Sequence, residues 1–339
     1  MKIIVTGSLG NISKPLTQIL VKQGHAVTVV SSDPNKQTAI ESLGATAAIG
    51  SIADADFLAT TFKSADAVYG MIPLSYTDPD PQGYLRRMAG NYVQALKHDA
   101  VPRVVVMSGW AADLVAGENA EDVFKELTGG AIAGATVTGP SLTFLRPASF
   151  YSNFYQSINL IRGKGLIGKF LTLRHCGLWA LLTGKTGLLM GNYGGDDRTV
   201  FVSPLDIADA VAEELLLHPD KTTTRPGTTT RPDTTTIRPD TTTIRYVGSE
   251  EMTCNEAATI IGTAIGKPWL KWVLLSDKQM LQGLKMAKLP EKLAEMLVKM
   301  QAAMHSGKTL VNFHRNNPKM GKVKLADFAK EFATVYHKQ

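Results

Sequence analysis

Cysteine is nearly missing from this chain of 339 residues, which contains only Cys176 and Cys254, far apart in the sequence. So few thiols exclude a disulfide framework and a cysteine-rich metal site, and they fit a reducing compartment. No apolar run is long enough to cross a bilayer, and the N-terminal one is too short for a signal peptide. The composition therefore predicts a cytoplasmic globular protein that has no membrane partner and holds no metal ion.

The chain also lacks any cluster of like charges, although its net charge is +6. The segment 267–339 carries 14 Lys and Arg against 5 Asp and Glu, and the remainder is slightly acidic. A basic tail can bind nucleic acid or acidic partners. These lysines, however, stand singly among Leu and Met, which favours the solvated faces of amphipathic helices. We do not expect a nucleic-acid partner.

What is present begins at the N-terminus with a strand, a glycine turn and a helix. The β-branched run Ile3–Thr6 leads into the pattern G-x-x-G-x-x-S from Gly7 to Ser13, and apolar residues at helical spacing follow from Pro15. Glycine permits a tight turn and a close backbone approach to a pyrophosphate, and the following helix offers free N–H groups to phosphates. This order of elements predicts a dinucleotide-binding unit. The open alternative is an ordinary strand–helix turn without a ligand.

The end of the second predicted strand, Ala26–Val30, is where such a fold meets the adenosine ribose. A site for NAD usually places an acidic residue there, whereas this chain has Ser31 and Ser32, with Lys36 close behind. Hydroxyls and an ammonium group suit a 2′-phosphate. The pattern favours NADP over NAD, which stays the alternative because Asp33 stands beside the serines.

Further strands alternate with helices, which predicts an α/β fold of Rossmann type, a doubly wound parallel sheet. We expect strands at 45–50, 66–73, 103–108 and 143–147, and a long helix at 83–98. Residues 1–150 would form this domain, with 196–218 returning to it. Residues 151–195 and 246–339 would form a smaller, mostly helical substrate-binding domain. The tandem repeat of Thr, Arg and Pro at 222–245 predicts a disordered insertion, with its last copy running into a strand at 243–247.

Several stretches together resemble the NmrA-like family of atypical short-chain dehydrogenases. They are VTGSLGNIS, VVSSDPNK, FLRPASFYSNF, VSPLDIADAVA, VGSEEMTCNEAATIIGTAIGKP and KLADFAKEFA. The resemblance spans nearly the whole chain and implies a Rossmann domain that binds NAD(P), followed by a smaller substrate domain. The chain departs from the usual family turn at Ser8, Leu9 and Ser13, and it lacks the arginine that often follows the second strand.

The resemblance also implies roles for individual residues. The pyrophosphate would be lined by Gly7, Leu9, Gly10, Asn11 and Ile12. The adenosine ribose would meet Ser31, Ser32 and Lys36, and the nicotinamide would be bordered by Ile72, Pro73, Ser108 and Pro147. We expect an aromatic substrate pocket drawn from Tyr76, Trp110, Phe150 and Tyr151.

A catalytic acid is the last feature that the sequence lacks. Short-chain dehydrogenases commonly use Tyr-x-x-x-Lys, in which the lysine lowers the pKa of the tyrosine so that it can pass a proton. No tyrosine lies between Tyr92 and Tyr151, and Lys125 has Glu121 four residues before it. We therefore expect an NAD(P)H-dependent reductase of quinones or similar small unsaturated or aromatic substrates, with its catalytic residues unknown.

Two alternatives stay open. The first is a non-catalytic NAD(P)-binding redox sensor with a protein partner, since the family includes such members. The second is a protein like the sugar-nucleotide epimerases, against which the missing Tyr-x-x-x-Lys counts.

Overall fold

The computed structural model describes residues 1–115, 120–127, 140–163, 174, 182, 185–217 and 242–338. The chain forms two compact units, each made of segments that are separate in the sequence. The first unit comprises Met1–Pro147, Pro204–Val247 and Arg315–Lys319. The second comprises Ala148–Ser203, Gly248–His314 and Met320–Gln339.

The first unit is built on a seven-stranded sheet in which every neighbouring pair is parallel. Its spatial order is β10-β6-β5-β4-β1-β2-β3, which is a Rossmann-type arrangement and confirms the predicted fold class. The strands are β1 (Lys2–Val5), β2 (Ala26–Ser31), β3 (Thr46–Ile49), β4 (Ala67–Gly70), β5 (Arg103–Met107), β6 (Ser141–Pro147) and β10 (Thr242–Val247). The central strands are buried on both faces, which explains their continuous apolar runs.

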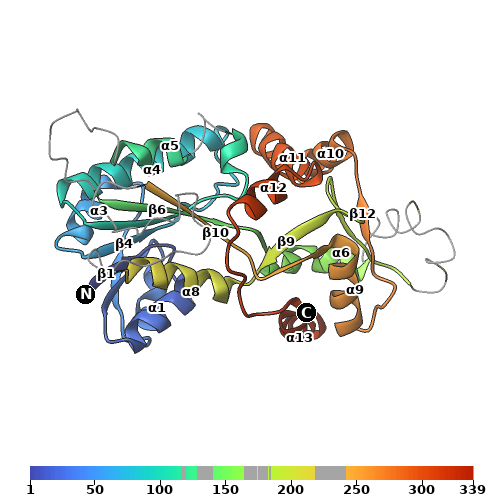
Figure 1. Ribbon diagram of the computed structural model, residues 1–339, viewed down its shortest axis with the longest axis horizontal. Helices are drawn as coiled ribbons and strands as arrows, with labels where there is room; N and C mark the ends of the chain where they lie inside the picture. The colour runs from blue at the N-terminus through green and yellow to red at the C-terminus, as the bar shows by residue number, and fades with distance from the viewer. Residues whose placement is uncertain are drawn as a thin grey trace. The chain divides into compact units, whose positions relative to one another are not determined.

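Helices cover both faces of this sheet, as Figure 1 shows. On one face lie α3 (Ala55–Phe62), α4 (Pro81–His98) and α5 (Ala120–Phe124), and on the other lie α1 (Ser13–Lys22) and α8 (Pro204–Leu215). The short α2 (Gln37–Glu41) precedes β3. The carboxylate of Asp54 caps α3 by accepting the N–H of Phe57 at 3.0 Å.

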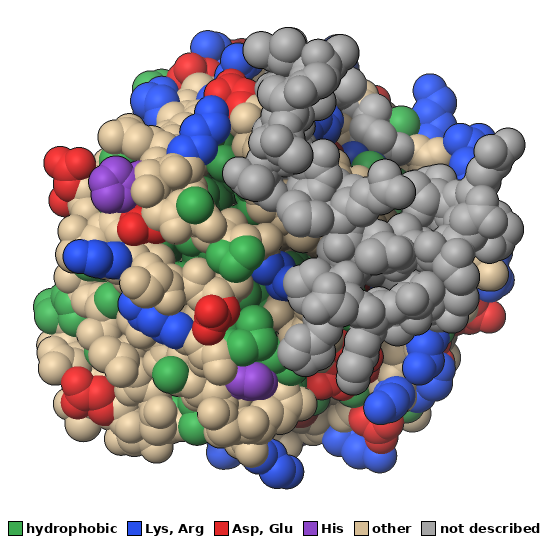
Figure 2. Space-filling model, turned by 60° about the vertical axis from the view of Figure 1, so that its left-hand side comes forward, with side chains coloured by type: hydrophobic (Ala, Val, Ile, Leu, Met, Phe, Trp, Pro, Cys, Tyr) green, Lys and Arg blue, Asp and Glu red, His purple; other side chains and the backbone are tan. Residues whose placement is uncertain are grey.

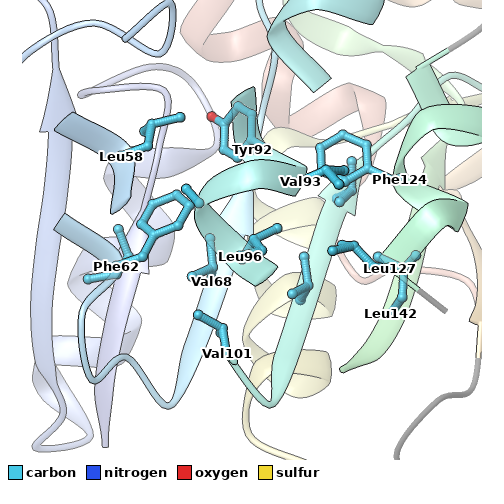
Figure 3. Packing of buried hydrophobic residues seen from close by; sticks show 14 of the residues in the cluster. Leu58, Phe62, Val68, Tyr92, Val93, Leu96, Val101, Phe124, Leu127 and Leu142 are labelled. Atoms are coloured by element: carbon cyan, nitrogen blue, oxygen red, sulfur yellow. The ribbon is translucent and has the colours of Figure 1, made fainter. Parts of the chain in front are cut away.

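Aromatic and branched side chains fill the space between the sheet and the first helical layer. Figure 3 shows Leu58 and Phe62 of α3 and Tyr92 and Leu96 of α4 packed against Val68 of β4. The second half of α4 contributes Ala89, Tyr92, Val93, Ala95 and Leu96 to this core, beside β4 and the turn that follows it. That turn leads to the carboxyl edge of the sheet, where parallel α/β sheets bind ligands.

Strand β10 confirms the prediction that the last copy of the repeat runs into a strand at 243–247. Residues 242–245, which the predicted disordered insertion also includes, belong to β10, which pairs with β6 at the edge of the first unit's sheet. Arg245 explains the order, because it forms ion pairs with Glu213 (2.5 Å) and Glu214 (3.1 Å) of α8. The predicted boundary at 246 therefore falls within a strand of the first unit. The repeat up to Thr241 lies outside the described residues.

The second unit is mixed, with two small sheets. Strand β9 (Arg198–Val202) pairs antiparallel with β11 (Glu250–Thr253) and parallel with β7 (Ser149–Phe150). A second, parallel pair joins β8 (Leu189–Gly191) to β12 (Trp272–Leu274). Residues 198–202 thus belong to this unit, whereas the sequence analysis assigned 196–218 entirely to the first domain.

Helices make up most of the rest of the second unit. They are α6 (Ile158–Arg162), α9 (Cys254–Ala264), α10 (Asp277–Met286), α11 (Glu291–His305), α12 (Lys308–Arg315) and α13 (Leu325–Lys338). Capping boxes begin two of them: Thr253 with Glu256 starts α9, and Ser276 with Gln279 starts α10. None of the helices among the described residues is both long and apolar enough to span a membrane.

Candidate functional site

The glycine turn between β1 and α1 has a backbone that few side chains would permit. Gly7 has φ +91° and Ser8 has φ +55°, and the N–H of Gly10 donates to the carbonyl oxygen of Gly7 at 3.1 Å. A Cβ on Gly7 would lie 2.7 Å from both Met71 Cε and Ser13 Oγ. Glycine is therefore required at the first position of the motif for backbone and for packing reasons.

The third position of the motif holds Ser13 in place of glycine, and the structure shows how it fits. Its hydroxyl donates a 2.7 Å hydrogen bond to the carbonyl oxygen of Thr6, and the side chain is buried. The serine therefore packs the first turn of α1 against the end of β1, which is the role that the third glycine of such a motif plays.

The start of α1 is open toward a ligand. Its N-cap residue, Ile12, makes no side-chain hydrogen bond to the helix. In the first turn, the N–H of Lys14 donates to the carbonyl oxygen of Gly10 at 3.1 Å, and Pro15 has no N–H. Gly10 and Asn11 are exposed, Leu9 is half-buried, and the side chain of Ile12 is buried, which leaves only the backbone of Ile12 for a contact. The exposed backbone at Gly10 and Asn11 and the positive end of the helix dipole suit a pyrophosphate, so the predicted residues fit a dinucleotide.

The end of β2 joins this turn through two hydroxyls. Ser8 Oγ donates to Ser31 Oγ at 2.9 Å, and the N–H of Ser8 donates to the carbonyl oxygen of Val30 at 3.0 Å. The carboxylate of Asp33 accepts the N–H of Asn35 at 2.9 Å, within the turn that follows β2. Ser32 and Lys36 are exposed. Ser31, by contrast, is buried, so its hydroxyl holds the turn to β2.

The segment after β4 is fixed by two buried side chains. Thr6 Oγ1 accepts the N–H of Met71 at 2.8 Å, and the hydroxyl of Tyr92 donates to the carbonyl oxygen of Met71 at 3.1 Å. Burial raises the pKa of Tyr92 far above its usual value of 10.0, so it remains a neutral donor. Ile72, half-buried, and Pro73, exposed, follow directly, which places both at the carboxyl edge of the sheet as the sequence predicts.

The ends of β5, β6 and β10 carry a buried polar network that the sequence analysis missed. Ser108, directly after β5, donates its hydroxyl to Glu121 Oε1. Glu121 also accepts two hydrogen bonds from Arg146, Nε to Oε1 at 2.9 Å and Nη2 to Oε2 at 2.7 Å. Arg146 Nη1 donates in turn to the hydroxyl of Tyr246 at 3.0 Å. Pro147 ends β6 beside this network.

Both charged members of the network are withdrawn from solvent, with Glu121 only 3% and Arg146 only 4% exposed. Burial alone would lower the pKa of Arg146, but the hydrogen bonds and charge of Glu121 outweigh it and raise that pKa. The ion pair is therefore permanent at neutral pH. One feature of the sequence could have indicated this network, namely a lone arginine, Arg146, in the otherwise apolar strand FLRP. Charged residues are rarely buried unless they are paired, so such an arginine implies a buried acidic partner.

The predicted aromatic residues are divided between the two units. Tyr76 is 58% exposed and Trp110 is buried, and both belong to the first unit. Phe150 belongs to β7 of the second unit. Tyr151 is fully buried in the core of that unit, with its ring 5.5 Å from that of Phe328. The prediction that Tyr151 lines a substrate pocket is therefore wrong, because packing within its own unit uses the whole ring.

The sequence predicts no metal site. Among the described residues, no group of three or more His, Cys, Asp or Glu side chains is arranged to hold a metal ion. Cys254 is buried, which raises the pKa of its thiol to about 12. Cys176 lies outside the described residues.

Solved structures with the same fold include several dinucleotide-dependent proteins. An NADPH-dependent quinone oxidoreductase from Escherichia coli, complexed with NADPH, matches with a TM-score of 0.63 at 19% identity, over 97% of this chain and 99% of that one. A triphenylmethane reductase from Citrobacter sp. matches with a TM-score of 0.64 at 16% identity, over 98% and 100%. At such identities the likeness shows the fold.

A third relative widens the range of activities found on this fold. A structure described as a nucleoside-diphosphate-sugar epimerase from Staphylococcus aureus matches with a TM-score of 0.64 at 15% identity, over 97% of this chain and 100% of that one. No curated protein sequence matches this chain significantly.

Part of the sequence matches a family model. Residues 7–138 match the family model described as NAD(P)H-binding, a stretch that begins at the first glycine of the turn and runs past Ser108 and Glu121. This segment of the first unit therefore resembles NAD(P)H-binding domains, in agreement with the glycine turn and the parallel sheet.

Proposed function

We propose that this protein is an NAD(P)H-dependent oxidoreductase that reduces a quinone or a similar small unsaturated or aromatic substrate. The observation that carries the proposal is the surroundings of Ser108. This residue follows β5 at the carboxyl edge of a dinucleotide-binding sheet, and its hydroxyl is bound by the Glu121–Arg146 ion pair. The sequence has no Tyr-x-x-x-Lys motif near this serine to supply a proton. The substrate should therefore be one whose reduction needs little proton transfer from the protein.

The preferred cofactor in this proposal is NADP(H). Ser32 and Lys36 are exposed at the end of β2, where the adenosine ribose binds in this fold. Asp33 would repel a 2′-phosphate, but its Oδ1 accepts the N–H of Asn35 and is thereby engaged in the turn. Lysine and serine can then bind a phosphate through charge-assisted hydrogen bonds. NAD(H) is the alternative cofactor.

In this mechanism the dinucleotide, when bound, supplies the hydride. The backbone of the turn from Gly7 to Ile12 would bind the pyrophosphate, and the hydrogen bond from Ser13 to Thr6 holds the start of α1 against the end of β1. Hydride addition to a quinone gives an oxyanion that is delocalised over the ring, and water can protonate it. A simple ketone would give a localised alkoxide, which requires an acid, and the sequence has no Tyr-x-x-x-Lys after Ser108 to supply one.

The test is steady-state oxidation of NADPH by the purified protein. A panel of benzoquinones and naphthoquinones should be reduced, whereas unactivated ketones and secondary alcohols should show negligible turnover under the same conditions. Cofactor binding is measured in parallel by calorimetry, so that a protein without cofactor is not mistaken for an inactive one. Tight binding without oxidation by any quinone would overturn the reductase proposal in favour of the redox sensor.

The two other functions remain distinguishable candidates. A redox sensor would bind the dinucleotide and then change its affinity for a protein partner, without turnover. The epimerase candidate is favoured by the Staphylococcus aureus structure, which resembles this chain as closely as the reductases do. An epimerase would convert a sugar nucleotide with no net consumption of cofactor.

The proposal needs a small-molecule substrate and no nucleic-acid or membrane partner. On the face shown in Figure 2, described Lys and Arg side chains are interspersed with Asp and Glu, so they form no continuous basic patch there. A cytoplasmic location remains a prediction, which cell fractionation would test.

A further inference from the structure

Ser108 is the outermost member of the network that holds it. Its backbone N–H donates to the carbonyl oxygen of Leu145 at 2.8 Å, which fixes the residue between the ends of β5 and β6. Its side chain is half-buried, whereas Glu121, Arg146 and Tyr246 behind it are buried. Of these four side chains, the Ser108 hydroxyl is therefore the one that a bound substrate could reach.

The direction of the hydrogen bond between Ser108 and Glu121 is fixed by charge. Both carboxylate oxygens of Glu121 accept hydrogen bonds from Arg146, at 2.9 and 2.7 Å. A carboxylate in such a two-point ion pair is ionised and has no proton to give. The proton between the two oxygens must come from Ser108. Moving it to Glu121 would leave an alkoxide on Ser108 and would shift the negative charge away from its ion pair with Arg146, which is strongly unfavourable.

A serine hydroxyl has one proton and two lone pairs. Since the proton of Ser108 is committed to Glu121, only the lone pairs remain for a ligand. We propose that Ser108 acts as a hydrogen-bond acceptor toward the substrate, so that the site prefers quinones that carry an amino or hydroxyl donor beside the reducible carbonyl. This inference rests on the proposed reductase function and names its substrate class.

The same geometry makes Ser108 a poor partner for a bare carbonyl. A carbonyl oxygen approaching Oγ would meet a lone pair and no proton, and both groups would lose their water. A substrate N–H or O–H instead recovers a hydrogen bond that water provided before binding. Selectivity of this kind arises because a buried polar group left unpaired costs free energy.

The experiment compares two ligands of similar shape, 2-amino-1,4-naphthoquinone and 2-methyl-1,4-naphthoquinone. Their dissociation constants are measured by calorimetry on the full-length protein saturated with NADP⁺, so that no turnover takes place. The wild type should bind the amino compound about three- to ten-fold more tightly, the range that one neutral hydrogen bond provides. Ser108→Ala should bring the ratio close to one, and Ser108→Thr, which keeps a hydroxyl, should restore the preference.

Ser42→Ala is the matched control, since Ser42 is exposed and its hydroxyl bonds only within its own turn, to the carbonyl oxygen of Thr38. It should keep the wild-type ratio. Equal wild-type affinity for the two compounds, or an unchanged ratio in Ser108→Ala, would overturn the inference while the reductase function stands. If neither naphthoquinone binds or is reduced, the proposed function fails, and the inference falls with it.

Discussion

Ser13 Oγ donates a 2.7 Å hydrogen bond to the carbonyl oxygen of Thr6, and this bond joins the first turn of α1 to the end of β1. The carbonyl oxygen of Ser13 in turn accepts the hydroxyl of Thr17 at 2.7 Å. Both side chains are buried. The serine thus replaces the last glycine of the motif with a residue that still packs closely and adds a hydrogen bond.

We expect Ser13→Ala to lower the free energy of unfolding by about 1 kcal/mol, because a buried carbonyl loses its donor. The measurement is the urea midpoint of the wild type and the variant, followed by circular dichroism. Ser42→Ala removes an exposed hydroxyl and should leave the midpoint unchanged. A Ser13→Ala midpoint equal to that of the wild type would show that the bond contributes nothing to stability.

The local parts of the site could be predicted from the sequence. A β-branched run, two glycines and an amphipathic segment specify the unit from β1 to α1, because each of these elements depends on neighbours a few residues apart. For the same reason, the sequence predicts that Ser31, Ser32 and Lys36 lie at the end of β2. All of the strands expected between Ile3 and Pro147 form in the first unit.

The long-range parts could not be predicted. Glu121 and Arg146 are 25 residues apart and meet only because β5 and β6 are neighbours and α5 lies over them. No periodic pattern in the sequence indicates which acidic residue a buried arginine pairs with. Similarly, Tyr151 follows a strand in an aromatic, polar stretch that suggests a binding surface, yet its partner Phe328 lies far along the chain. Arg245 was assigned to the repeat, because its partners on α8 could not be foreseen.

Lys36 provides a test of the cofactor preference. Lys36→Ala should weaken binding of NADPH about tenfold, through loss of a charge-assisted hydrogen bond to the 2′-phosphate, and should leave binding of NADH nearly unchanged. Calorimetry with both cofactors measures the effect. Lys22→Ala, an exposed lysine in the last turn of α1, is the control and should affect neither cofactor. Tighter wild-type binding of NADH than of NADPH would refute the preference.

The threonine repeat should be expendable up to the start of β10. Deleting residues 228–241 shortens a connection, and loop length changes closure entropy by only about 0.6 kcal/mol per doubling. We therefore expect little change in the melting temperature or in cofactor affinity. Arg245→Ala, by contrast, should lower the melting temperature by several degrees, because it removes one charged partner of the buried carboxylate of Glu214. A large loss of stability in the deletion variant would mean that the repeat contributes to the fold.

The last prediction concerns acid stability and the second unit. Burial alone would raise the pKa of Glu251, but hydrogen bonds from His314 (2.7 Å) and Arg198 (3.1 Å) outweigh it and hold that pKa below its usual 4.5. A carboxyl group whose pKa is lower in the folded state stabilises the fold above its unfolded pKa. That contribution is lost as the pH falls below about 4.5 and through the folded-state value.

Glu251→Gln should therefore lower the urea midpoint at pH 7, and the difference from the wild type should shrink steadily between pH 4.5 and pH 3. The matched control is Glu291→Gln, which removes an exposed carboxylate paired with Lys285. Because surface pairs contribute little to stability, its effect should be small at every pH. The contrary outcome is a difference in urea midpoint between Glu251→Gln and the wild type that stays constant down to pH 3. Because protonation of Glu251 in the wild type removes its charge but not its packing, a constant difference would assign the lost stability to side-chain packing.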